Sequence, residues 1–130
     1  MIFIEDTYKV EQKDNLLRVT PSWDMPEYLP EVFMEIKQAL DITAEEMEQK
    51  ILAGFDLNSH HFYRQAADED FPFVSLEFCD DFELGGTVIK IYIKDNTRGG
   101  VFVITTQHSL EAAEGHGIRF WNSLKTMSII

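Results

Sequence analysis

The feature that most constrains the fold of this chain is a two-residue periodicity in its second half. Apolar and polar residues alternate through residues 71–79 and again through 86–94, and successive side chains of a β-strand point to opposite faces of a sheet. The connection 95–100 is rich in residues that accept a positive φ, and it leads into an apolar segment at 101–106. These segments predict a three-stranded meander. Its core-facing residues are expected to include Val74, Leu76, Phe78, Ile89, Ile91 and Ile93.

A further pair of strands is predicted near the N-terminus. Residues 2–10 and 16–20 alternate more loosely, and Lys13-Asp14-Asn15 lies between them at the position of a turn. The segment 21–26 begins and ends with proline. Because each proline fixes its own φ and restricts the residue before it, we expect regular structure to stop there.

Two helices are predicted after this break. Pro30 suits the first turn of a helix over residues 30–40. The apolar stripe of that helix would comprise Val32, Phe33, Ile36, Ala39 and Leu40. Thr43, with Glu46 three residues later, has the pattern of a capping box, and Gly54 suits the C-cap of the helix that follows. The short connection predicts an antiparallel helical hairpin.

A last helix is predicted after Ser109, which can serve as its N-cap. The element order is then ββ-αα-βββ-α. This order predicts an α+β fold in which an antiparallel sheet has helices packed on one face. At 130 residues the chain has the size of one domain, and we expect residues 1–130 to form a single domain.

The remaining sequence features favour a cytoplasmic protein. The longest apolar runs, such as 101–104, have four or five residues, whereas a membrane-spanning helix needs about twenty. The N-terminus turns acidic after three apolar residues and has no basic leader, which is not typical of a signal peptide. Cys79 is the single cysteine and cannot form an internal disulfide.

The charge of the chain is unevenly distributed. The net charge is −12, and residues 24–83 hold 16 Asp and Glu against Lys37, Lys50 and Arg64, a net of −13. A field of one sign repels nucleic acid and anionic membranes and attracts cationic partners. We therefore expect a basic protein partner and neither nucleic acid nor a membrane. Solubility alone is the other explanation of an acidic excess.

The sequence contains no motif of a catalytic, cofactor or metal site. His60-His61, His108 and His116 lack the spacings typical of zinc ligands. Cys79 lies between Glu77 and Asp80, and this negative charge would raise the pKa of its thiol rather than activate it. We therefore predict no catalytic, cofactor-binding or metal-binding residue, and no positive evidence indicates an enzyme.

The acidic segments are the remaining candidates for a functional site. Aromatic residues lie among them, and aromatic anchors surrounded by charge are typical of protein-binding hot spots. The candidate partner-binding residues are Glu45, Glu46, Glu48, Asp68, Glu69, Asp70, Asp80, Asp81, Glu83, Trp23 and Tyr63.

In its size and in the acidic segments Glu45-Glu46-Met47-Glu48, 68–70 and 80–83, the chain resembles the small immunity proteins of bacterial contact-dependent or polymorphic toxin systems. The resemblance is one of type and carries no signature motif. It implies a non-enzymatic protein that binds a cognate nuclease-like toxin domain and neutralises it by covering its cationic surface. Complementary charge would speed such an association.

Two alternatives stay open. One is a small enzyme or ligand-binding protein whose site is assembled around His108 and His116. The other is an oligomeric adaptor with an apolar contact face, for example around Phe120-Trp121.

Overall fold

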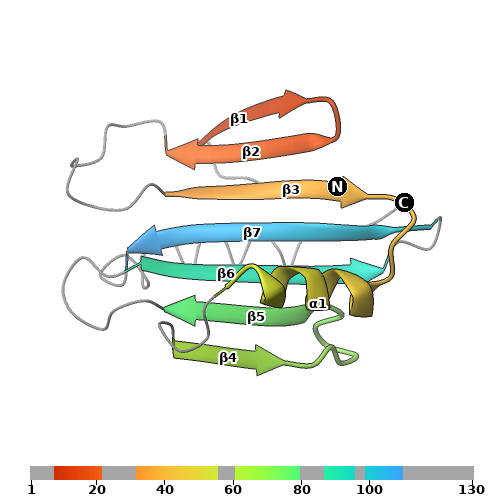
Figure 1. Cartoon of the computed structure of the whole chain (residues 1–130). Coiled ribbons are helices and arrows are strands. Elements are labelled where there is room, and N and C mark those ends of the chain that lie inside the picture. Colours follow the sequence, from red (N-terminus) through yellow and green to blue (C-terminus); the bar gives the residue numbers. More distant parts are fainter. Residues whose placement is uncertain (1–7, 22–31, 56–60, 80–86, 96–98, 110–130) are drawn as a thin grey trace.

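The computed structural model describes residues 8–21, 32–55, 61–79, 87–95 and 99–109, which form an antiparallel β-sheet with a short helix on one face (Figure 1). The elements in chain order are β1 (Tyr8–Lys13), β2 (Leu16–Pro21), β3 (Phe33–Ala39), α1 (Ala44–Ala53), β4 (His61–Gln65), β5 (Val74–Cys79), β6 (Thr87–Asp95) and β7 (Val101–Ser109).

The strand order across the sheet is β1-β2-β3-β7-β6-β5-β4, and every neighbouring pair is antiparallel. Neighbours in the sheet are also consecutive strands of the chain, except at the centre, where β3 pairs with β7. After β3 the chain forms α1, which lies over β5 and β6, and then returns to the sheet at its edge as β4 (Figure 1). The edge strands are therefore β1 and β4.

One face of the sheet packs against α1. Strand alternation directs Leu76, Phe78, Ile91 and Ile93 toward Met47, the buried residue of the helix. Burying side chains of this size removes apolar surface from water and is worth roughly 1.5–3 kcal/mol each. This packing attaches the helix to the β5–β6 half of the sheet.

The opposite face carries a second core. Val19, Met34, Tyr92 and Ile104 are buried there. Phe71, in the connection between β4 and β5, meets Tyr92 edge-on at 5.7 Å between ring centroids. The sheet therefore buries apolar side chains on both of its faces.

The predicted α+β fold, with the order ββ-αα-βββ-α and helices packed on one face, is wrong. The described part of the chain is mostly antiparallel sheet, with seven strands and one short helix. The main error lies in residues 30–40, which were expected to form the first helix of a helical hairpin. Residues 33–39 of that segment are strand β3.

The sequence of β3 fits both the helical and the strand periodicity. Pairing within the sheet favours the strand. Val32, Met34 and Ile36 lie at two-residue spacing, and all three pack in the core of the face opposite α1. Leu40, counted in the predicted helical stripe, is 66% exposed. Because β3 lies between β2 and β7, its backbone groups pair on both sides, which local helix propensity cannot match.

Other predicted elements are confirmed. The hairpin around Lys13-Asp14-Asn15 is present as β1 and β2, with Asp14 at φ 55° in its turn. Helix α1 begins after the Thr43 capping box and ends at Gly54 as predicted. The meander is present as β5, β6 and β7, and β7 continues to Ser109. The helix predicted after Ser109 and the start of the first predicted strand lie outside the described residues.

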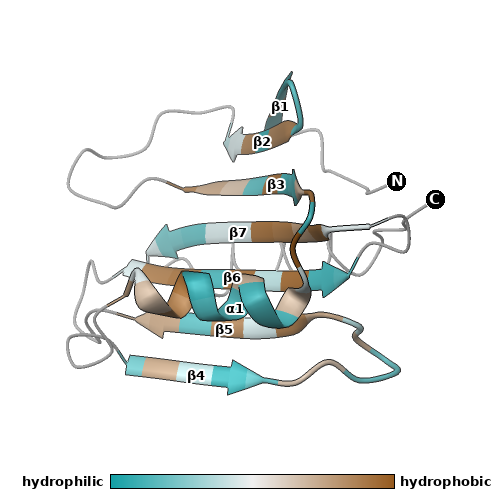
Figure 2. Cartoon of the chain, turned by 45° about the vertical axis from the view of Figure 1, so that its right-hand side comes forward, coloured by the Kyte–Doolittle hydropathy of each residue, from teal (hydrophilic) through white to brown (hydrophobic). Residues whose placement is uncertain are grey.

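Strand β4 was not predicted. Its five residues are all exposed, so they show no alternation between buried and exposed positions. Figure 2 shows it as a mostly hydrophilic strand at the edge of the sheet. Within the described ranges, α1 has ten residues, and no helix there is long and apolar enough to cross a membrane.

Candidate functional site

Acidic residues from three separate parts of the chain gather at one end of the sheet. The backbone N–H of Ala44 donates to Asp95 Oδ1 at 3.0 Å, which places the start of α1 at the end of β6. Val74 pairs with Ile93 near the same end, so the connection from β4 to β5 lies there as well (Figure 1). This surface, called the acidic end below, carries the exposed residues Asp41, Glu45, Glu46, Asp68, Glu69, Asp70 and Asp95.

The first turn of α1 uses part of this charge for its own stability. Thr43 Oγ1 accepts a hydrogen bond from the backbone N–H of Glu46 at 3.1 Å, and Glu46 Oε1 accepts one from the N–H of Thr43 at 3.3 Å. Carboxylates near a helix N-terminus also interact favourably with its dipole. Glu46 therefore has a structural role, whereas Glu45, its exposed neighbour, makes no ion pair among the described residues.

Glu48 does not belong to the acidic end. Its side chain is only 13% exposed and is paired with Arg64 of β4. This hydrogen bond and the nearby negative charge raise the pKa of Arg64 above its ordinary value. The charge of Glu48 is thus compensated within the protein, and we do not assign it to partner contact.

The connection between β4 and β5 presents the other acidic segment. Asp68 Oδ1 accepts a hydrogen bond from the backbone N–H of Phe71 at 2.7 Å, and the N–H of Asp68 donates to the Phe71 carbonyl at 3.0 Å. Such a turn, closed by the aspartate side chain, is a common role of Asp in loops. It leaves Glu69 and Asp70 exposed at the tip of the turn, with no ion pair among the described residues.

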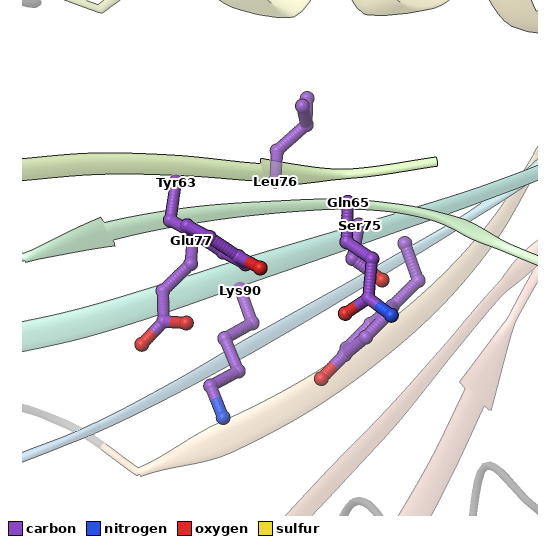
Figure 3. A pocket seen from close by; sticks show the side chains of 7 residues that line it. Tyr63, Gln65, Ser75, Leu76, Glu77 and Lys90 are labelled. Carbon is purple, nitrogen blue, oxygen red and sulfur yellow. The ribbon is translucent and has the colours of Figure 1, made fainter. Parts of the chain in front are cut away.

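Strand β4 supplies aromatic surface beside the acidic end. Phe62 lies on the α1 side of the sheet, where its ring is 5.2 Å from that of Phe78. Tyr63 lies on the opposite side and is 63% exposed. Figure 3 shows Tyr63 with Glu77 and Lys90 around a pocket. The volume of this pocket is about 90 Å³. A pocket of this size is too small for most organic ligands.

The structure divides the predicted partner-binding residues into three groups. It places Glu45, Glu46, Asp68, Glu69 and Asp70 in elements at the same end of the sheet, and all five are exposed. It places Glu48 in an internal ion pair and Tyr63 on the face of the sheet opposite α1. The remaining four lie outside the described residues: Trp23, Asp80, Asp81 and Glu83.

Sequence reasoning did not find two members of the acidic end. Asp41 follows β3, which was expected to be helical. Asp95 is the last residue of β6 and follows the alternating part of that strand. Asp95 stands beside a turn signal, Asn96-Thr97-Arg98-Gly99-Gly100. Its contact with the start of α1, 51 residues away in the chain, has no signal in the sequence.

His108 does not form an accessible site. It is 1% exposed on β7, and its Nδ1 lies 2.7 Å from the Ser109 carbonyl oxygen. Within the described residues, no group forms a hydrogen bond with its Nε2. Burial lowers the pKa of His108, so the ring is neutral at physiological pH. His116, its predicted companion, lies outside the described residues.

The described residues contain no group of three or more His, Cys, Asp or Glu side chains arranged to hold a metal ion. Cys79 is 5% exposed and therefore poorly placed for chemistry with solvent or substrate. The acidic end does present exposed functional groups. The sequence matches no protein-family model and no curated protein.

Proposed function

We propose that this protein is a non-enzymatic binding module that uses its acidic end to cover a cationic surface of a partner protein, as an immunity protein covers a nuclease-like toxin domain. The observation that carries the proposal is that the first turn of α1, with Glu45, and the β4–β5 connection, with Glu69 and Asp70, lie at the same end of the sheet (Figure 1). These residues are exposed and are not used in ion pairs among the described residues.

The support is electrostatic. Exposed carboxylates that share one surface add their fields, which attracts a basic partner and raises the rate of encounter. They also repel the phosphates that a nuclease must bind, so occupancy of the cationic cleft excludes the substrate. Aromatic Tyr63, on the neighbouring edge strand, would supply contact area at the border of such an interface.

A charge-reversal experiment tests the proposal. Where the gene immediately upstream encodes a toxin, the C-terminal domain of that toxin is the partner to be used, and the readouts are the association rate and the inhibition of its nuclease activity. We expect Glu45→Lys and Glu69→Lys each to slow association by about tenfold at low salt, with a smaller effect at high salt.

Glu11→Lys is the matched control, because Glu11 is exposed on β1 at the other edge of the sheet and the change in charge is the same. An equal loss of binding in Glu11→Lys would show that only net charge matters. Binding that is independent of salt and of both reversals at the acidic end would contradict the proposal.

The alternative of a site around His108 and His116 has less support, because His108 is neutral and 1% exposed. The alternative of an oligomeric adaptor was placed around Phe120-Trp121, which lies outside the described residues.

A further inference from the structure

A groove runs along α1 on the side that faces the centre of the sheet. Helix α1 lies over β5 and β6. On the same face of the sheet, β7 and β3 lie beside the helix (Figure 2). The groove between them has a volume of about 380 Å³. Small-molecule sites in proteins have volumes of about 300–1,000 Å³. The groove is larger than the pocket beside Tyr63, and different residues line it.

The lining of this groove is mainly apolar. The helix contributes Met47 and Ile51, which are one turn apart and so share one side of α1, and Phe55 follows at the end of the helix. Ala39 and Val103 form the floor beside the helix. Except for the buried Met47, these residues are half-buried. A hydrocarbon or aromatic group in the groove would cover apolar surface that is now in contact with water.

Two lysines give the groove a positive rim. Lys37 of β3 and Lys50 of α1 both line it, and both are exposed. Among the residues that the structure describes, no other ionisable residue lines the groove. This is unusual in a chain of net charge −12, whose segment 24–83 holds only one further basic residue, Arg64.

Two carboxylates of the described segments that lie close to these lysines in the sequence are engaged in other contacts. Glu35, next to Lys37 on the same side of β3, is paired with Arg18 of β2. Glu46, one turn before Lys50, is held in the capping box with Thr43. Among the described residues neither Lys37 nor Lys50 forms an ion pair. Both ammonium groups are therefore available to an anion placed over the apolar floor.

We propose that this groove binds a small amphipathic carboxylate, with its hydrocarbon part between α1 and the β3–β7 floor and its carboxylate between Lys37 and Lys50. An ammonium group binds a carboxylate through charge-assisted hydrogen bonds. The hydroxyl of Thr105, which also lines the groove, adds a neutral hydrogen-bonding group. The site lies on the α1 side of the sheet and does not use the carboxylates of the acidic end.

Titration with decanoate, decanol and decyltrimethylammonium, each below its micelle concentration, tests this proposal. The three probes share one hydrocarbon chain and differ in the charge of the head group. We expect decanoate to bind about tenfold more tightly than decanol, and the cation to bind more weakly than either. Amide chemical shifts of Ala39, Ile51 and Val103 would report that the ligand occupies the groove.

The double variant Lys37→Gln, Lys50→Gln should reduce the affinity for decanoate to that for decanol. Lys9→Gln, Lys13→Gln is the matched control, because both of these lysines are exposed on the edge strand β1 and the change in net charge is equal. The control should bind decanoate as the unmodified protein does. Circular dichroism should show that both variants are folded, as expected for exposed positions.

Three outcomes would overturn the proposal. The first is an absence of decanoate binding by the unmodified protein. The second is an equal affinity of the unmodified protein for decanoate and decanol. The third is an equal loss of decanoate affinity in the two double variants. Self-association that Ile51→Trp abolishes would assign the groove to a second copy of the chain, and would also overturn it.

Discussion

Arg64 Nε donates hydrogen bonds to both carboxylate oxygens of Glu48, at 3.1 Å each, and Arg64 Nη2 lies 3.0 Å from Glu48 Oε1. The two residues belong to β4 and α1, and β5 lies between β4 and the rest of the sheet. The ion pair therefore joins the exposed edge strand to the helix directly. It also removes one carboxylate from the surface that we assign to partner binding.

Replacing Arg64 by Gln should loosen β4. Among the described strands, β4 pairs with β5 alone, and β4 has no buried residue. The ion pair with α1 is one of the contacts that hold it in place. We expect faster amide hydrogen exchange in β4 and unchanged exchange in β6 and β7. Arg64→Lys keeps the charge but lacks the forked geometry, so it should give an intermediate rate. Unchanged exchange in β4 for Arg64→Gln would show that the ion pair does not restrain the strand.

Replacing Gly100 by Ala should destabilise the protein much more than replacing Gly99. Both glycines have positive φ, 103° for Gly99 and 79° for Gly100. A Cβ on Gly100 would lie 2.1 Å from the Ala39 carbonyl oxygen, whereas a Cβ on Gly99 meets nothing within 4 Å. Gly99→Ala should cost only the backbone strain, about 1–2 kcal/mol. Urea denaturation would measure both variants, and equal losses would contradict this prediction.

Replacing Phe78 by Ala should cost about 3–5 kcal/mol of unfolding free energy. Phe78 is 1% exposed, and its ring stacks on that of Phe55 at 3.9 Å between centroids. Its removal would open a cavity beneath the end of α1. Val10→Ala, on the exposed part of β1, serves as a control, because Val10 is 49% exposed and its loss should change stability little. Chemical denaturation of the two variants provides the comparison.

His108 should make the protein less stable as the pH falls below about 6.5, its ordinary pKa. Burial lowers the pKa of His108 in the folded state, so below pH 6.5 the unfolded chain binds a proton that the folded chain does not. Lys90 lowers this pKa further, while the Ser109 carbonyl and Glu77 oppose the shift. The associated stability is complete above pH 6.5 and is lost as the pH approaches the folded-state pKa.

Unfolding free energies between pH 7.5 and 5.5 would measure this effect. His108→Asn should weaken the dependence in this range, whereas His61→Asn, at an exposed position, should leave it in place. A His108 resonance that titrates in the folded protein with its ordinary pKa would contradict the prediction.

The elements that could be predicted are those whose stabilising contacts lie close together in the sequence. The capping box of Thr43 and Glu46 and the turn at Asp14 were predicted because their stabilising contacts lie within a few residues of each other. Strand β3 was assigned wrongly because a segment of its length satisfies both helical and strand periodicity. The deciding contacts are with β7, at positions such as Ala39 and Val101.

The candidate site was predictable in part for the same reason. The acidic segments containing Glu45 and Asp68–Asp70 are visible in the sequence, but their meeting at one end of the sheet depends on the strand order. The sequence also does not distinguish Glu45 from Glu48, three residues later. Only the position of Arg64 on an unpredicted edge strand shows that Glu48 is neutralised.

The central pairing of β3 with β7 has a consequence for how the chain folds. Strands β1 to β3 form one meander and β4 to β7 another, and within each meander the paired strands follow one another directly in the chain. Ala39 and Val101, by contrast, are 62 residues apart (positions 39 and 101). Closing so long a loop costs entropy before any contact repays it. We therefore expect the two meanders to form early, and their joining at β3 and β7 to be the slow step that sets the folding rate.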